Sequence, residues 1–388
     1  MPRHLRRGFF HIIVGRLSYF YTQFTHSMSI ENNYVAIMAG GIGSRFWPES
    51  RMSYPKQFID ILGTGRSLIQ WTYQRFTNIC PKENIYFITN QQYINTLKEQ
   101  IPEVSDANII SEPSRKNTAP CAAYFAHKMM ALNPKANIIM SPADHLIMDE
   151  RAFERTAHEA LEFVAQHDAL LTLGIKPTRP DTGYGYIQYD AEDELDQLYK
   201  VKTFTEKPSL DLARTFLKSG DFLWNSGIFV WNVKTIMEAL EKFLPEMNEV
   251  FLQATTAYNT PKEHEIISSL YSQCTNISID YGIMEKAKNV YVIPSYFGWC
   301  DLGTWESAYE NFDKDYLGNA VHGDNVMIID ASECMIKVPN EKLLVVQGLE
   351  RFIVIDTPDV LLICERNREQ QIKEYVAEVK RNKGDKYL

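Results

Sequence analysis

The stretch VAIMAGGIGSRFWPESRMSYPKQF, residues 35–58, decides the fold, because a short apolar strand runs directly into a glycine-rich loop. Gly40, Gly41 and Gly43 have no Cβ, so the backbone of this loop can approach a ligand closely and point N–H groups at phosphate oxygens. The stretch is therefore a candidate phosphate-binding loop at the end of a strand.

Two cations, Arg45 and Lys56, follow these glycines, and a purely structural turn rarely needs both. The glycine pattern is not G-x-G-x-x-G, because Phe46 stands where a third glycine would be. It is not the Walker pattern G-x-x-x-x-G-K-[ST] either. A dinucleotide-dependent dehydrogenase and a Walker-type nucleotidase are both disfavoured.

The composition of the 388-residue chain, with 45% hydrophobic and 12% aromatic residues, supports one large domain with an appendage or two modest domains. Its formal charge of −9 argues against a general polyanion binder, so we expect no nucleic-acid partner. Affinity for phosphates must then come from a local site that concentrates cations and backbone N–H groups. No apolar run reaches about 18 residues, so we expect no membrane span.

Residues 1–27 form a basic segment without an acidic residue or a periodic pattern. A secretory signal is disfavoured because Arg16 interrupts the apolar run and no small-residue cleavage site follows. We expect Met28 to be the natural start and residues 1–27 to be a non-native or disordered extension.

The cysteines show neither C-x-x-C pairs nor regular spacing, which indicates reduced thiols in a cytoplasmic protein rather than a disulfide framework. They are Cys80, Cys121, Cys274, Cys300, Cys334 and Cys364.

From residue 34 short β-rich runs alternate with helical ones, the pattern of a doubly wound, Rossmann-like α/β domain. We expect a mostly parallel sheet whose ligand loops lie at the carboxyl ends of its strands. Strands are predicted at 34–39, 84–90, 107–111, 136–144 and 169–175, and helices at 67–79, 91–101, 118–132 and 151–167.

Beyond Gly174 the pattern changes to more exposed, mixed strands and then to helices within residues 233–275. From about Ala320 short strands separated by turns predict a small β-rich domain that ends in a helix. We expect residues 28–315 to form the larger domain and residues 316–388 the β-rich one. In the terminal helix one apolar face is formed by Ile372, Tyr375, Val376 and Val379.

The loop GGIGSRFWPESR and the following PKQF resemble the signature of the sugar-nucleotide pyrophosphorylases, and the W-P and K-Q-F details are similar to the mannose-1-phosphate guanylyltransferase family. The resemblance continues in family order to about residue 305. Its further motifs are EPSRKNTAP (112–120), SPADHLI (141–147), RPDTGYGYI (179–187), FTEKP (204–208), WNSGIF (224–229) and GWCDLGTW (298–305). The tail segment IDTPDVLLICERN is also similar to the family, and the resemblance implies a nucleotide-diphospho-sugar transferase fold.

The resemblance implies nucleotidyl transfer, in which an oxygen of mannose 1-phosphate attacks the α-phosphorus of GTP, GDP-mannose forms and pyrophosphate leaves. Both reactants are anions, so the protein needs cations and a metal around the phosphorus and no nucleophile of its own. Arg45 would neutralise the developing pyrophosphate, Lys56 would contact the α-phosphate or the incoming phosphate, and Lys207 would bind the sugar phosphate. By resemblance Asp144 and Asp301 are the ligands of a Mg²⁺ cofactor, an ion that prefers hard oxygen ligands.

Guanine presents two donors side by side, N1–H and the N2 amino group, and one carboxylate can accept both. Adenine does not offer this pair of donors. We assign this role to Glu112, with Asn117 holding the loop or contacting the ribose or phosphate. The glycine backbone at Gly40, Gly41 and Gly43 would cradle the triphosphate.

The sugar would be bound by residues of the second half of the domain. Gly183 and Gly185 offer backbone N–H groups, and Glu206 offers an acceptor for sugar hydroxyls. Asn225 can both donate and accept, as a cluster of hydroxyl groups demands.

Several alternatives stay open. The sugar could be another hexose 1-phosphate, because the motifs fix the phosphates better than the epimer. A catalytically silent subunit that binds GDP-mannose and regulates a partner is the alternative from a different class, although the intact set of charges argues against it. A fused phosphomannose isomerase is disfavoured because no His-rich metal cluster follows the last motif. We also expect a homo-oligomer, a dimer, in which the β-rich tail serves association and the apolar runs KLLVVQ and DVLLIC pack against a partner's sheet or the core.

Overall fold

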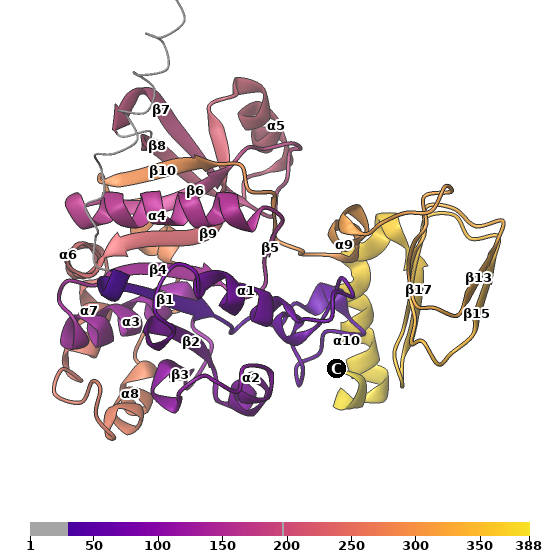
Figure 1. Ribbon diagram of the computed structural model, residues 1–388, viewed down its shortest axis with the longest axis horizontal. Coiled ribbons are helices and arrows are strands. Elements are labelled where there is room, and N and C mark those ends of the chain that lie inside the picture. The colour runs from indigo at the N-terminus through magenta and orange to yellow at the C-terminus, as the bar shows by residue number, and fades with distance from the viewer. Residues whose placement is uncertain (1–29, 196–197) are drawn as a thin grey trace, which may run out of the picture.

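The computed structural model describes residues 30–195 and 198–388 (Figure 1). Its larger domain is built on a nine-stranded sheet with the strand order β3-β2-β1-β4-β9-β6-β10-β8-β7. A separate two-stranded ribbon pairs β5 (Leu146–Ile147) with β11 (Trp299–Cys300). The strands of the large sheet are β1 (Asn33–Met38), β2 (Ile85–Asn90), β3 (Ile109–Glu112), β4 (Asn137–Pro142), β6 (Leu170–Ile175), β7 (Gly185–Leu195), β8 (Leu198–Glu206), β9 (Phe222–Asn232) and β10 (Val290–Ser295).

The sheet is mixed, which corrects the expectation of a mostly parallel sheet. Strands β3, β2, β1 and β4 pair in parallel, and β6 pairs in parallel with β10. Strand β9, however, lies antiparallel between β4 and β6, and the β7–β8 hairpin adds further antiparallel pairing. Strands covered on both faces are apolar throughout in either direction, so the apolar runs predicted burial and could not predict direction.

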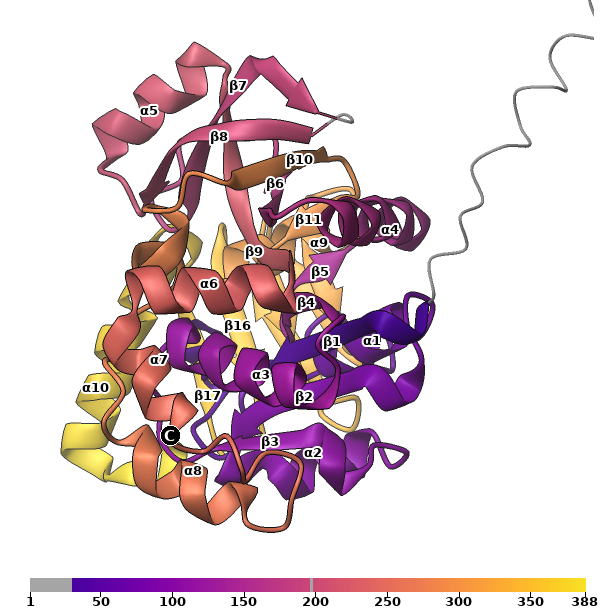
Figure 2. The same cartoon turned by 90° about the vertical axis from the view of Figure 1, so that its left-hand side faces the viewer.

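Helices cover both faces of the sheet, so neighbouring residues of β1 enter different cores. Tyr34 and Ala36 pack with helices on one face, and Val35 and Ile37 pack with helices on the other. The first face carries α3, α6, α7 and α8, of which α3 and α6 lie side by side in Figure 2, and the second carries α1, α2, α4 and α5. These helices are α1 (Leu68–Phe76), α2 (Ile94–Gln100), α3 (Thr118–Leu132), α4 (Glu150–Gln166), α5 (Leu210–Ser219), α6 (Val233–Phe243), α7 (Pro245–Leu252) and α8 (Glu263–Tyr271).

The smaller domain consists of short strands, coloured orange to yellow in Figure 1. Strands β12, β14 and β16 pair in parallel, β17 pairs antiparallel with β16, and β13 and β15 form a second parallel pair. Ile336, Val346 and Val354 meet in a small core between these strands. The strands are β12 (Ala320–His322), β13 (Val326–Ile329), β14 (Met335–Lys337), β15 (Leu344–Gln347), β16 (Phe352–Asp356) and β17 (Leu361–Glu365). The prediction of a β-rich domain that ends in a helix is confirmed.

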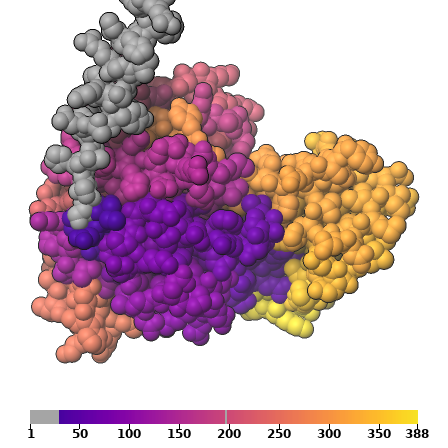
Figure 3. Space-filling view, in the orientation of Figure 1, coloured from indigo at the N-terminus to yellow at the C-terminus, as the bar shows by residue number. Residues whose placement is uncertain are grey.

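The terminal helix α10 (Ile372–Lys383) lies between the two domains (Figure 1). Ile372 is fully buried, and the other three residues of the predicted apolar face pack against the same core. We call this the interdomain core, because it also holds Phe46 of the phosphate loop and Trp305 at the start of α9 (Trp305–Asn311). Figure 3 shows the smaller domain lying directly against the larger one.

Polar contacts also tie the phosphate loop to the smaller domain. Nε1 of Trp47 donates a hydrogen bond of 2.8 Å to the carbonyl of Tyr387. The ammonium of Lys337 on β14 lies 2.9 Å from the carboxylate of Glu49, and both side chains are largely buried. The smaller domain therefore fixes this loop at two points, through Lys337 and Tyr387.

All six cysteines are free thiols. No helix in the described part of the chain combines the length and the apolar character needed to cross a membrane.

Candidate active site

The phosphate loop leaves β1 and folds back on itself at Gly43. This glycine has a φ of 67°, and a Cβ on it would lie 2.4 Å from the Cβ of Lys56, so no other residue fits without displacing the lysine. The N–H of Lys56 donates to the carbonyl of Ile42 at 3.4 Å, which closes the loop. The glycine therefore does more than permit close approach of a ligand, because it also seats Lys56.

The ammonium of Lys56 contacts oxygen atoms from two distant parts of the chain. The residue is only 4% exposed, and its Nζ lies 2.7 Å from Oδ2 of Asp144. It also donates to the carbonyl oxygens of Asp301, at 2.8 Å, and Leu302, at 3.1 Å. Burial opposes ionisation of Asp144, but Lys56 and, to a smaller extent, His145 more than offset this effect and hold the pKa of Asp144 below its ordinary value.

The two predicted metal ligands have different partners, because Asp144 pairs with Lys56 whereas Asp301 accepts hydrogen bonds. Oδ1 of Asp301 accepts hydrogen bonds from the Tyr184 hydroxyl, at 2.7 Å, and from the Gly303 N–H, at 3.2 Å. Within residues 30–195 and 198–388, no group of three or more His, Cys, Asp or Glu side chains could hold a metal by itself. Two carboxylates nevertheless fit Mg²⁺, which keeps several waters and takes oxygen ligands from substrate phosphates. The donor set suits a site completed by substrate.

A cavity of about 330 Å³ opens beside the phosphate loop, and we call it the Glu112 pocket. Glu112, at the end of β3, is 9% exposed, and the hydroxyl of Tyr271 donates to its Oε1. Burial raises the pKa of Glu112 to about 7, although the hydrogen bond from Tyr271 opposes this shift. The side-chain oxygen of Asn117 accepts the N–H of Thr118 at 2.9 Å and caps α3. The pocket is lined by Met38, Gly40, Gly41, Asn90, Glu112, Arg115, Lys116, Asn117, Thr118, Cys121, Pro142 and Asp144.

A second cavity, of about 640 Å³, lies on the side of the smaller domain, and we call it the Arg45 pocket. Nε of Arg45 is buried and has no hydrogen-bond partner among the described residues. The N–H of Gly183 donates to Oδ1 of Asp181 at 2.8 Å and is thus already hydrogen-bonded within the chain. The pocket is lined by Arg45, Arg179, Asp181, Thr182, Gly183, Tyr184, Lys207, Asp301, Gly303, Thr304, Glu306, Ser307, Glu310, Glu369 and Gln370.

The remaining predicted sugar residues form a cluster at the edge of the sheet. Gly185 pairs with Glu206 across β7 and β8, and a Cβ on Gly185 would lie 2.5 Å from Oε2 of that carboxylate. The glycine thus makes room for Glu206. Nδ2 of Asn225 donates to Asp280 at 2.9 Å, and its Oδ1 accepts from the hydroxyl of Thr172 at 2.9 Å. Burial, and after it the charge of Glu206, raises the pKa of Asp280 to about 6.

Lys56 joins the two pockets. Its ammonium contacts Asp144, which lines the Glu112 pocket, and the backbone of Asp301, which lines the Arg45 pocket. The structure therefore brings Gly40, Gly41, Glu112 and Asn117 together on one side of Lys56, and Arg45, Gly183 and Lys207 on the other.

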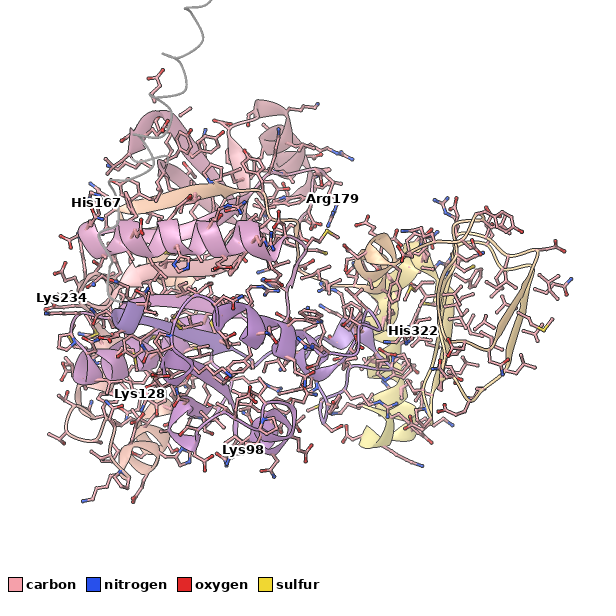
Figure 4. All side chains as sticks on the ribbon, in the orientation of Figure 1. Lys98, Lys128, His167, Arg179, Lys234 and His322 are labelled. Atoms are coloured by element: carbon pink, nitrogen blue, oxygen red, sulfur yellow. The ribbon has the colours of Figure 1, made fainter. Side chains whose placement is uncertain are left out.

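Several residues of the site were not predicted from the sequence. Arg115 and Lys116 line the Glu112 pocket, and Arg179 lines the Arg45 pocket on the side that faces the smaller domain (Figure 4). Arg179 donates to the Tyr184 hydroxyl at 3.2 Å. Arg115, Lys116 and Arg179 lie within motifs that supplied other site residues, so the sequence contained a signal that could have identified them. Asp280 lies outside every motif, and its place beside Asn225 is visible only in three dimensions.

Comparison with known proteins places the chain in a family. The nucleotidyl transferase model matches residues 34–316, and the MannoseP isomerase/GMP-like beta-helix domain model matches residues 324–379. The chain is 37% identical to the mannose-1-phosphate guanylyltransferase of Salmonella montevideo, over 89% of this chain and 73% of that protein. It is 34% identical to the alginate biosynthesis protein AlgA of Pseudomonas aeruginosa, over 88% of this chain and 71% of that protein.

Among solved structures, one described as a mannose-1-phosphate geranyltransferase from Thermus thermophilus is similar with a TM-score of 0.80 and 27% identity. The similarity covers 90% of this chain and 99% of that chain. Sequence and fold thus agree over both domains. The chain belongs to the nucleotidyl transferase family and, within it, to the mannose-1-phosphate guanylyltransferases.

Proposed function

We propose that this chain forms GDP-mannose and pyrophosphate from GTP and α-D-mannose 1-phosphate. The observation that carries the proposal is the position of Lys56, a buried cation between a pocket that holds the predicted nucleotide residues and a pocket that holds the predicted phosphate cations. The identity of the substrates is supported by the relatives, because the Salmonella protein is named for mannose 1-phosphate and guanylyl transfer.

In this proposal the α-phosphate of GTP lies beside Lys56, where the two pockets meet. An oxygen of mannose 1-phosphate forms a bond to the α-phosphorus while the bond to the β-phosphate oxygen breaks, and the electron pair leaves with pyrophosphate toward Arg45. Lys207 binds the incoming sugar phosphate. Mg²⁺ held by Asp144 and Asp301 would supply further positive charge at the phosphates. The attacking oxygen is already anionic, so the protein needs to orient and neutralise and does not need a general base.

Selectivity for guanine is proposed to reside in Glu112. Its Oε1 already accepts the Tyr271 hydroxyl, so the base contacts would use Oε2 and the remaining lone pair of Oε1. On the sugar side, Glu206 and Asn225 are proposed to contact hydroxyl groups. Asp280 fixes the amide of Asn225 and thereby sets which of its atoms donates.

We further propose that residues 28–315 and 316–388 act as the catalytic and the β-rich domain of a cytoplasmic homodimer. Side chains from the two predicted apolar runs alternate between the core and solvent. Leu343, Val345, Leu361 and Ile363 remain 56%, 52%, 55% and 53% exposed. This apolar surface supports association with a second copy of the chain.

The test is pyrophosphate release from the four common nucleoside triphosphates with mannose, glucose or fucose 1-phosphate, with Mg²⁺ present and then chelated. Turnover confined to GTP and mannose 1-phosphate, and abolished by chelation, is the expected result. Turnover with a different hexose 1-phosphate would identify another sugar substrate for the same nucleotidyl transfer. Binding of GDP-mannose without turnover of any pair would overturn the proposal in favour of a regulatory subunit.

A further inference from the structure

The Arg45 pocket is built by both domains. Glu369 and Gln370, which precede α10, line it together with residues of the larger domain. Helix α10 packs against the short helix Ser44–Phe46, and Ile372 and Phe46 are buried in the same interdomain core. Arg45 and Lys373 are the direct neighbours of these two core residues, so the packing brings their two segments together, and Arg45 itself lines the pocket.

Three of the acidic residues that line this pocket already have partners. Asp181 forms an ion pair of 2.9 Å with Arg179, and Glu306 pairs with Arg366. Glu369 accepts the backbone N–H of Glu306 at 2.7 Å. None of these three carboxylates forms an ion pair with Arg45 or Lys373.

Arg45 and Lys373 are left without an anionic partner. In the part of the chain that the structure describes, neither forms an ion pair within 4.0 Å. Nε of Arg45 is buried without any hydrogen bond. The charge of Arg45, and to a smaller extent burial, lowers the pKa of Lys373, as expected for a like charge nearby. Such a pair is stabilised when an anion of high charge enters between them.

We propose that Lys373 of the C-terminal helix joins Arg45 in binding the pyrophosphate group, both as the leaving end of GTP and as the attacking group of the reverse reaction. The inference rests on the proposed function and extends it, because it makes the β-rich domain part of the polyphosphate site. Lys373 forms no covalent bond and transfers no proton in this role. It is a binding residue whose charge is matched to pyrophosphate and not to the base or the sugar.

The reverse reaction distinguishes a specific role of Lys373 in pyrophosphate binding from a general effect on the site, because the concentrations of GDP-mannose and pyrophosphate are varied independently. Lys373→Ala is expected to raise KM for pyrophosphate about tenfold, the effect of losing one charge-assisted contact, while KM for GDP-mannose changes less than about twofold. Lys373→Arg is expected to restore most of the affinity. Lys380→Ala is the matched control, since Lys380 lies on the same helix and pairs with Asp385 at its far end.

A second measurement does not depend on turnover. Inorganic pyrophosphate alone should raise the midpoint of thermal unfolding of the wild-type chain and of Lys380→Ala, and it should raise that of Lys373→Ala much less. Unchanged KM for pyrophosphate and unchanged protection in Lys373→Ala would overturn the inference even if the wild type makes GDP-mannose. Lys373-dependent protection without any turnover would support the inference and count against the proposed function.

Discussion

The ammonium of Lys56 lies 2.7 Å from the carboxylate of Asp144, and this ion pair joins the phosphate loop to the loop that follows β4. The same ammonium binds two carbonyl oxygens beyond β11. A cation enclosed in this way has a fixed position before substrate arrives, so little reorganisation is needed when charge develops on the phosphates.

Replacing Lys56 by Met is expected to lower kcat about 10²–10³-fold, because a preorganised charge beside the reacting phosphate is lost. Lys56→Arg should recover little, since the side chain is only 4% exposed and the larger guanidinium has no room. The measurement is pyrophosphate release at saturating GTP. Lys98→Met, which removes a half-buried lysine that pairs with Asp106 (Figure 4), is the control. A kcat within tenfold of wild type for Lys56→Met would contradict the assigned role.

Activity should depend on the ionisation of Glu112. The pKa of this carboxyl is raised to about 7, so Glu112 is an acceptor pair above pH 7 and is increasingly protonated below it. We therefore expect kcat/KM for GTP to fall as the pH falls through about 7, while the GTP-to-ATP preference shrinks. In Glu112→Gln this acidic limb should be absent and selectivity low at every pH. If Glu112→Gln still shows the fall in kcat/KM at low pH, another titratable group causes that fall.

The dependence of turnover on Mg²⁺ should require the carboxylate of Asp301. Chelation is expected to abolish turnover, and Asp301→Asn should raise the Mg²⁺ concentration needed for half-maximal rate at least tenfold, because an amide is a weaker ligand than a carboxylate. Asp181→Asn is a matched control on the wall of the same pocket, where Asp181 pairs with Arg179. An equal shift in both variants would point to pocket electrostatics in place of metal binding.

The contact between Lys337 and Glu49 should stabilise the whole molecule. Both side chains are largely buried, with exposures of 9% and 14%, so Lys337→Met leaves an unpaired buried carboxylate and should cost about 3–5 kcal/mol of unfolding free energy. The double variant Lys337→Met with Glu49→Gln should recover part of this loss. Urea unfolding measures both. Arg51→Met breaks the more exposed pair with Asp359 and should destabilise the fold less than Lys337→Met does.

Dimerisation is expected to depend on the exposed apolar side chains of β15 and β17. Val345→Lys and Ile363→Lys place charges at positions that are 52% and 53% exposed, so the fold of a single chain should tolerate them. Sedimentation velocity should show a dimer for the wild type and a monomer for the double variant. A wild-type monomer, or a double variant that still dimerises, would move the interface elsewhere.

The sequence predicted local elements well where one physical signal dominated. Helix α3 occupies the predicted residues 118–132, because Asn117 caps its start and apolar residues fill its length. Strand β1 was predicted from a run of buried residues that ends at the glycines. Strand direction was not predictable, since β9 runs antiparallel to β4 and β6 and yet is buried over most of its length, as they are.

The candidate site was predicted as a set of residue types more than as an arrangement. The motifs supplied Arg45, Lys56 and Asp144, but nothing in the sequence indicated that Lys56 would bind the backbone of Asp301. Gly185 was predicted to donate an N–H, whereas its missing Cβ accommodates Glu206. Such roles depend on which segments meet, and that is a property of the folded chain.

The hydrogen bond between Trp47 and the carbonyl of Tyr387 spans 340 positions of sequence. During synthesis the loop that carries Arg45 leaves the ribosome long before helix α10 and Tyr387, which contact it. All strands of the large sheet lie within residues 33–295, so the sheet can pair before these contacts form. We therefore expect the loop to become ordered later in synthesis than the sheet beside it.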